Sequence, residues 1–216
     1  MTRVRFSITM SVDGYMAGPN QTREEPLGVG GEALHDWAVK LEAFHKVQGK
    51  TVPGEVNASS QMMYEMFENV GAVIMGRNMF GPIRGEWPDD TWKGWWGKNP
   101  PYHVPVFVLT HHARAPQPME GGTTFYFATD GIESTLDHAK KAAGGKDVLL
   151  GGGASTIRQY LAAGLVDEAG LSVASMLLGA GERPLELGPD VGVTFEQTRV
   201  IEAPGVTHLR YRVTRR

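Results

Sequence analysis

Three short apolar runs, each ending in glycine or in small and basic residues, constrain the fold of this chain more than any other feature. They cover residues 72–75, 105–110 and 147–150. Runs this short and this apolar are typical of strands that are buried on both faces, as in a mostly parallel sheet covered by helices on either side. The runs therefore predict the middle strands of a covered sheet.

The segments around these runs show helical and strand-like patterns. From the spacing of apolar residues, helices are expected over residues 32–48, 62–70, 132–143 and 154–163. Further strands are expected over residues 4–10, 123–128, 168–178, 194–202 and 207–213. Because the last three follow one another without a helix, they are expected to be antiparallel.

The order of these elements predicts an α/β fold with three layers. We expect a mixed, mostly parallel central sheet with antiparallel C-terminal strands and helices on both faces. The chain has 216 residues and no linker rich in proline, glycine or serine, so a single domain over residues 1–216 is expected.

The composition excludes several kinds of site. The formal net charge of -3 gives no general attraction to nucleic acid or acidic membranes, so neither is an expected partner, and a phosphate-bearing ligand needs its own pocket. The absence of cysteine excludes disulfides, thiolate metal sites and a cysteine nucleophile. No apolar stretch of about 18 residues and no signal-peptide pattern is present, so a cytoplasmic location is expected.

The end of the run 72–75 has the chemistry of an anion site. Gly76 allows close approach of the backbone, and a helix that begins there would offer free N–H groups. Arg77, followed by Asn78, can bind a phosphate through two nitrogens. The alternative is a surface arginine at an ordinary turn.

Three glycines, Gly151–Gly153, follow the run 147–150 directly. They allow the backbone to contact a flat or phosphorylated ligand without intervening side chains. The helix expected from Ala154 carries Ser155 and Thr156, which can cap it or donate to a phosphate. The spacing differs from the GxGxxG of a Rossmann fold, and a plain turn is the alternative.

The run 105–110 ends in hydroxyl, imidazole and guanidinium groups. Thr110, His111, His112 and Arg114 suit the 2′-phosphate that distinguishes NADPH from NADH. No metal site is expected, because adjacent histidines on an extended chain point to opposite faces and no carboxylate follows closely.

The order and spacing of these motifs resemble the dihydrofolate reductase superfamily, including the reductase domain at the carboxyl end of the bifunctional riboflavin-biosynthesis enzyme. The resemblance covers nearly the whole chain. It rests on residues 11–18 (SVDGYMAG), 75–77 (MGR), 108–110 (VLT), 151–157 (GGGASTI), 165–168 (LVDE) and 177–181 (LLGAG).

The resemblance implies a dihydrofolate-reductase-like fold with NADPH lying across the sheet. The pyrophosphate would lie between the helix starts at Arg77 and Ala154, the adenosine near Thr110, and the nicotinamide beside Met16 and Ala17. The implied cofactor-binding residues are Met16, Ala17, Gly76, Arg77, Asn78, Thr110, His111, His112, Gly151, Gly152, Gly153, Ala154, Ser155 and Thr156.

The resemblance also implies a small-molecule substrate pocket between the first strand and the helix that bears Trp37. His35 and Asp36 are the candidate catalytic residues, as proton donors. The candidates for substrate binding are Asp13, Trp37 and Trp95. Leu34 stands where classical dihydrofolate reductases have a carboxylate that binds the pterin. The alternatives are a solvated Asp36, a locally packed His35 and an Asp13 that only shapes its turn.

Four of the five tryptophans lie within residues 86–102. Such a cluster can be a lid over a planar substrate, a subunit contact in a homodimer, or a loop pinned to its own domain by its indoles. A nucleic-acid stacking platform is disfavoured, because only two lysines lie within the segment.

The leading hypothesis is an NADPH-dependent reductase that transfers hydride to a small pterin-like, pyrimidine or related heterocyclic substrate. The alternative is a non-catalytic nucleotide- or pterin-binding protein of the same fold, which the missing carboxylate favours.

Overall fold

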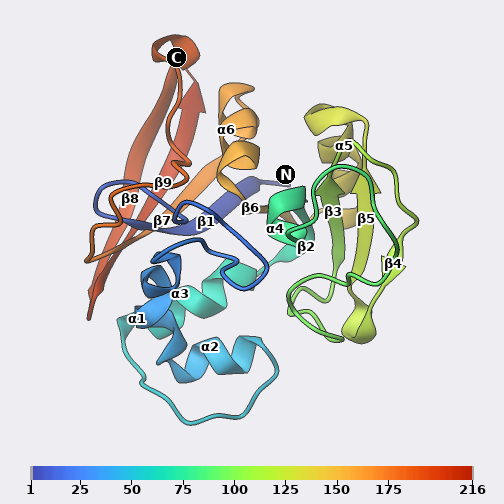
Figure 1. Ribbon diagram of the computed structural model, residues 1–216. Helices are drawn as coiled ribbons and strands as arrows, with labels where there is room; N and C mark the ends of the chain where they lie inside the picture. The colour runs from blue at the N-terminus through green and yellow to red at the C-terminus, as the bar shows by residue number, and fades with distance from the viewer. Residues whose placement is uncertain (1, 216) are drawn as a thin grey trace.

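The computed structural model describes residues 2–215 and contains one mixed sheet of nine strands (Figure 1). The strands are β1 (Val4–Ser11), β2 (Val70–Gly76), β3 (Pro105–Leu109), β4 (Gln117–Pro118), β5 (Thr124–Ala128), β6 (Asp147–Gly152), β7 (Glu168–Ala174), β8 (Val193–Ala203) and β9 (Val206–Arg215). Their order across the sheet is β4-β5-β3-β2-β6-β1-β7-β9-β8. The strands from β5 to β7 in this order pair in parallel, and β4, β9 and β8 pair antiparallel. The expected mixed, mostly parallel sheet is therefore confirmed.

Helices cover both faces of this sheet. They are α1 (Asp36–Val39), α2 (Glu42–Val47), α3 (Ala58–Phe67), α4 (Arg77–Phe80), α5 (Gly131–Ala143) and α6 (Ala154–Ala162), with 3-10 turns η1 (Gly31–His35), η2 (Glu120–Gly122) and η3 (Pro189–Val191). α5 and α6 pack on one face (Figure 1), in a buried cluster that includes Ile74 and Leu150. The neighbouring residues Val73 and Leu149 belong to a second cluster, which also contains Phe80 and partly buried tryptophans.

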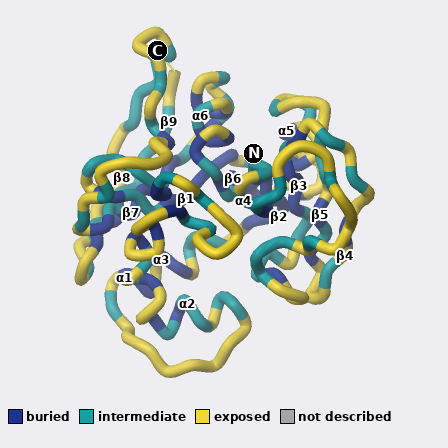
Figure 2. The backbone as a smooth tube through the Cα atoms, viewed as in Figure 1, coloured by how far each residue is buried: buried dark blue, intermediate teal, exposed yellow. Residues whose placement is uncertain are grey.

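Alternation explains why the three runs are apolar except for Thr110 and Asp147 at their ends. Successive side chains of a strand point to opposite faces, and in β2, β3 and β6 both faces are covered. Figure 2 shows these strands as the buried centre, with exposed loops at the periphery. The long hairpin of β8 and β9 is mostly half-buried or exposed, because it continues past the covered part of the sheet.

The helix expected over residues 32–48 is wrong as a single element. The structure divides it into η1, α1 and α2, and Leu41 between α1 and α2 is extended, with φ -79° and ψ 136°. The cause is the segment that follows α2. The Glu55 N–H donates to the Lys40 carbonyl at 2.8 Å, and the Glu42 N–H donates to the Glu55 carbonyl at 3.0 Å. These bonds replace the helical ones and keep Leu41 fully buried.

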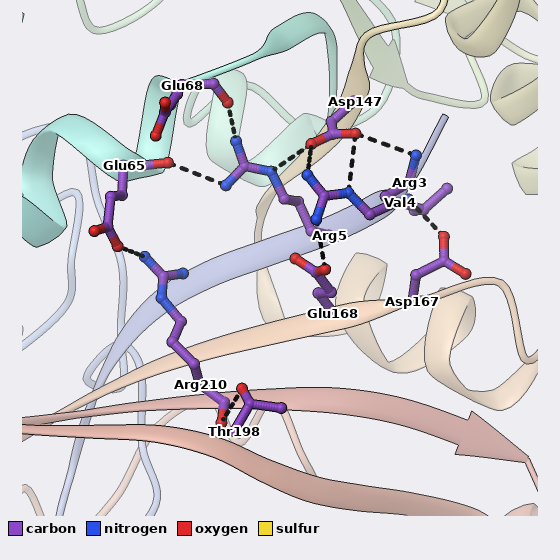
Figure 3. Close-up of polar contacts among 10 residues, drawn as sticks. All are labelled: Arg3, Val4, Arg5, Glu65, Glu68, Asp147, Asp167, Glu168, Thr198 and Arg210. Carbon is purple, nitrogen blue, oxygen red and sulfur yellow. Dashed lines mark hydrogen bonds and ion pairs between the residues drawn. The ribbon is translucent and has the colours of Figure 1, made fainter. Parts of the chain in front are cut away.

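A network of ion pairs joins the amino ends of β1 and β6 to the end of α3 (Figure 3). The Asp147 side chain, only 2% exposed, accepts hydrogen bonds from Arg3 Nη2 at 2.9 Å and from the Arg3 backbone N–H at 3.2 Å. Arg5 pairs with Asp147 at 3.5 Å and donates to the Glu65 and Glu68 carbonyls at the end of α3. Burial alone raises the pKa of Asp147, but the hydrogen bonds from Arg3 outweigh it and hold this pKa below its usual value. The network stabilises the edge of the sheet where β1 and β6 begin. The residues suited to an anion follow the parallel strands at the opposite edge.

Candidate active site

A cavity of about 710 Å³ lies at the carboxyl ends of the parallel strands. Ligands of open α/β sheets bind at this edge, because loops and helix starts converge there. Residues from the ends of β2, β3 and β5 and from Gly153, directly after β6, contribute to its lining, together with the loop after β1 and the tryptophan segment 86–102. The segments that follow the apolar runs 72–75, 105–110 and 147–150 therefore all face one cavity.

Most of the residues expected at the cofactor line this cavity. The lining residues among them are Met16, Ala17, Gly76, Arg77, Asn78, Thr110, His111, His112, Gly153, Ala154, Ser155 and Thr156, and Trp95 joins them. Gly151 and Gly152 are not part of the lining, although a Cβ on Gly152 would stand 3.6 Å from Met16 Cε.

Only one residue of the triple glycine requires glycine for its backbone. Gly152 has φ +109°, in the left-handed region that side chains disfavour. The peptide bond between Gly152 and Gly153 is cis. A Cβ on Gly153 would meet nothing within 4 Å, so the space beside it is open. The turn therefore leaves backbone accessible at the start of α6.

Arg77 brings a guanidinium group to the cavity that has no acidic partner among residues 2–215. Its Nη1 donates to Thr110 Oγ1 at the long distance of 3.4 Å, and its Nε and Nη2 are buried without a hydrogen-bond partner. Burial, and then the nearby charges of Arg84 and Arg114, lower the pKa of Arg77. A partly desolvated cation with two free donors is suited to an anion.

The expected helix dipole at Arg77 contributes little. α4 has only 4 residues, so few peptide units align there, and the attraction to an anion comes from the side chain. α6 has 9 residues, and its first backbone N–H groups belong to the part of the chain that lines the cavity.

The two candidate catalytic residues lie outside the cavity lining. Asp36, in the first turn of α1, is exposed. Burial lowers the pKa of His35, which therefore favours the neutral form, and its buried Nδ1 has no hydrogen-bond partner. Trp37 meets the ring of His208 edge-on, with centroids 4.9 Å apart, rather than the cavity.

Asp13 holds a loop instead of facing the cavity. Its carboxylate accepts from the backbone N–H of Leu178 at 3.0 Å and of Gly179 at 2.7 Å. A hydrogen bond from Ser11 and the one from Leu178 lower the pKa of Asp13 to about 2. The same loop continues to Glu182, which pairs with Ala17 at the cavity wall.

The tryptophan segment is pinned to its own chain. Trp92 Nε1 donates to the Phe80 carbonyl at 3.0 Å, and Trp87 Nε1 donates to the His112 carbonyl at 2.9 Å. Trp95 and Trp96 line the cavity, so the segment also forms one of its walls.

Several lining residues were not identified from the sequence. They include Gln21, Leu27, Arg84, Trp96 and Glu182. They come from loops without a periodic pattern, and only the density of tryptophan in one segment could have indicated any of them.

Two absences hold for residues 2–215. No group of three or more histidine, aspartate or glutamate side chains is arranged to hold a metal ion. Within the same residues, no helix is both long and apolar enough to span a membrane.

Solved structures with the same fold include reductases. A protein of Shewanella sp. PV-4 assigned to riboflavin biosynthesis is 23% identical, with a TM-score of 0.59 and full coverage of both chains. A pyrimidine reductase-like protein of Corynebacterium diphtheriae is 13% identical, with a TM-score of 0.54 over 100% of this chain and 93% of that one. Dihydrofolate reductase of Enterococcus faecalis, solved with NADP(H), is 12% identical, with a TM-score of 0.52 over 98% and 96% of the two chains.

Sequence comparison identifies the family. No curated protein matches the chain. The profile of the RibD C-terminal domain matches residues 2–208, nearly the whole length. Because the match covers the strand ends and the cavity that they enclose, the chain belongs to the RibD C-terminal domain family.

Proposed function

We propose that this protein is an NADPH-dependent reductase that transfers hydride to a small pterin-like, pyrimidine or related heterocyclic substrate. Membership of the family supports a reductase of the riboflavin-pathway, dihydrofolate-reductase-like type. The observation that carries the proposal is the guanidinium of Arg77, which has no acidic partner among residues 2–215 and two nitrogens without a hydrogen bond, in a cavity that is also lined by the start of α6. We expect the protein to act in the cytoplasm.

The lining residues have the chemistry that a phosphorylated dinucleotide needs. Arg77 and the hydroxyl of Thr110 would bind the 2′-phosphate, and backbone groups from Gly153 to Thr156 would hold the pyrophosphate without intervening side chains. Met16 and Ala17, beside Gly152, would contact the nicotinamide. When bound, the nicotinamide supplies the hydride, and the protein holds the two rings in reacting geometry.

The cavity walls offer apolar surface that suits a flat substrate ring, and Glu182 is the acidic residue among the described lining residues. Trp95 and Leu27 offer apolar surface. Leu34 is fully buried where classical dihydrofolate reductases have their carboxylate, so folate is not the substrate we propose. With His35 and Asp36 outside the lining, water in the cavity is the proton donor that we favour.

Fluorescence titration with NADPH and NADH tests the proposal. The wild-type protein should bind NADPH saturably, and Arg77→Ala should weaken NADPH by about 10- to 100-fold, because a charge-assisted hydrogen bond to phosphate is lost. NADH should be affected much less. Arg84→Ala is the matched control, since its exposed guanidinium already donates to the Gly81 carbonyl and a smaller loss is expected. No saturable binding at millimolar NADPH would contradict the proposal.

The second candidate is a binding protein without turnover. The position of His35 and Asp36 outside the cavity lining favours it, because no side chain expected to donate a proton then faces the ligand. Cofactor binding without NADPH oxidation across a panel of pterins, pyrimidines and flavins would support it. Oxidation with any member of the panel would support the reductase.

A further inference from the structure

Trp87 lies directly against the guanidinium of Arg77. The distance from Arg77 Cζ to the centroid of the indole is 3.7 Å, the shortest such distance among residues 2–215. At this separation a cation is attracted by the face of the ring, and most strongly by tryptophan. The indole is therefore the main direct contact of this guanidinium besides Thr110.

The indole is itself fixed on several sides. Its Nε1 donates to the His112 carbonyl at 2.9 Å. Its ring meets Phe80 and Phe127 edge-on, with centroids 6.0 and 5.3 Å away. Arg114 Cζ lies 4.9 Å from the centroid. Trp87 therefore has little freedom to move away from Arg77.

Arg114 is itself held by protein partners, so we do not expect it to bind the ligand phosphate in place of Arg77. It pairs with Asp90 at 3.1 Å and donates to the Trp92 carbonyl at 2.9 Å and to Gln117 Oε1 at 3.0 Å. Its side chain is 3% exposed. Arg114, between β3 and β4, is thus held by partners in the tryptophan segment and in β4, and it packs against the indole.

Arg77 would leave its position without such a support. It has no acidic partner among the described residues, and the charges of Arg84 and Arg114 repel it. A flexible cation in this situation turns toward solvent, where it is hydrated. Contact with the indole offsets the repulsion and leaves Nε and Nη2 without protein partners. A donor pair that is held in place before the ligand arrives costs less entropy on binding.

We propose that Trp87 is a positioning residue that holds the Arg77 guanidinium ready for a phosphate monoester on the bound dinucleotide, and so determines the preference for phosphorylated over unphosphorylated cofactor. This inference rests on the proposed function, because it requires a dinucleotide in the cavity. It gives the tryptophan segment a role in cofactor selection, which the number of its tryptophans alone did not indicate.

The test compares Trp87→Leu and Trp87→Phe with the wild-type protein. The probes are NADPH, NADH, adenosine 2′,5′-bisphosphate and adenosine 5′-phosphate. Trp87→Leu should lose about 5- to 20-fold in affinity for the two probes with a 2′-phosphate, as expected for a lost cation–π contact that is partly desolvated. Affinity for the other two should change less than about 2-fold. Trp87→Phe keeps a ring face and should show an intermediate loss, which also keeps the test open if the leucine variant does not fold.

Two controls separate positioning from a general structural effect. Trp92→Leu removes an indole from the same segment that does not contact Arg77, so the ratio of NADPH to NADH affinity should stay at the wild-type value. In an Arg77→Ala background, Trp87→Phe should cause no further loss, because the two residues act through one interaction. Once turnover is found, KM for NADPH should rise in Trp87→Phe while kcat stays unchanged.

Each outcome has a distinct meaning. Equal losses for probes with and without the 2′-phosphate, or additive losses for Arg77 and Trp87, overturn the role of Trp87 and leave the reductase proposal standing. A wild-type protein that binds adenosine 2′,5′-bisphosphate no better than adenosine 5′-phosphate overturns the inference as well. Absence of binding for all four probes removes the proposed function and the inference with it.

Discussion

A Cβ on Gly76 would stand 2.5 Å from Oγ1 of Thr156, so the end of β2 touches the first turn of α6. Real Cβ atoms do not approach this closely, and Thr156 is buried. Two segments that are distant in the sequence thus come together at the cavity wall, at a position without a side chain. This contact brings Arg77 and the start of α6 to the same cavity.

Gly76→Ala should therefore lower the free energy of unfolding by about 1–3 kcal/mol, because the added methyl group overpacks the contact. Urea unfolding measures the change. Adding Thr156→Ala removes Oγ1 and should restore most of the loss, whereas Thr156→Ser keeps the oxygen and should restore little. A double variant no more stable than Gly76→Ala alone would show that Oγ1 is not what the methyl group meets.

Asp147→Ala should destabilise the protein by about 3 kcal/mol, because it leaves the buried guanidinium of Arg5 without its acidic partner. NADPH affinity should not change, since the network of Figure 3 lies at the other end of the sheet. Glu196→Ala removes an exposed partner of Arg212 and should cost less than about 0.5 kcal/mol. Similar losses in the two variants would contradict the role assigned to burial.

Acid should destabilise the fold through His208, which is 1% exposed. Its ring nitrogens bond to the hydroxyls of Ser59 and Ser172 at 2.8 Å, Trp37 packs on the ring, and burial followed by the charge of Arg210 lowers the pKa of His208 to about 4.

In the unfolded chain this histidine titrates near 6.5, so between pH 6.5 and 4 the unfolded state binds more protons. The stability that the neutral ring contributes is present above pH 6.5 and is lost as the pH falls toward 4, by about 3 kcal/mol in total. Unfolding in urea over this range measures the slope. His208→Gln keeps hydrogen-bonding groups but does not titrate, so it should flatten the dependence of the unfolding free energy on pH. An unchanged slope would mean that other groups cause the acid destabilisation.

Asp13→Ala should loosen the loop before Glu182, because the N–H groups of Leu178 and Gly179 lose their acceptor. Hydrogen exchange at these two amides should become faster by about 10-fold, as expected when a charge-assisted hydrogen bond is removed. NADPH should bind more weakly, since the loop supports Ala17 at the cavity wall. The exposed Asp190→Ala serves as control and should leave both measurements at wild-type values. Unchanged exchange in Asp13→Ala would contradict the role of this carboxylate.

The class of fold and much of the lining of the candidate site could be predicted from the sequence. A strand covered on both faces is apolar over most of its length, and this local property is visible in residues 72–75, 105–110 and 147–150, where only Asp147 and Thr110, at the ends of their runs, are polar. The glycines and Arg77 follow these runs directly, so their meeting at one edge follows from the parallel arrangement. The single domain remains a prediction, as does the homodimer.

Contacts between distant segments decided the rest. Periodicity predicted one helix over residues 32–48, but Glu55 returns to bond at Lys40 and Glu42 and breaks it. In the resulting arrangement, His35 and Asp36 lie outside the cavity lining. The contact of Trp87 with Arg77 likewise joins a loop to a strand end. The local sequence pattern indicates which residues must be buried. The hydrogen bonds of a loop depend on where the folded sheet places the groups that bond to the loop, so only the tertiary structure shows them.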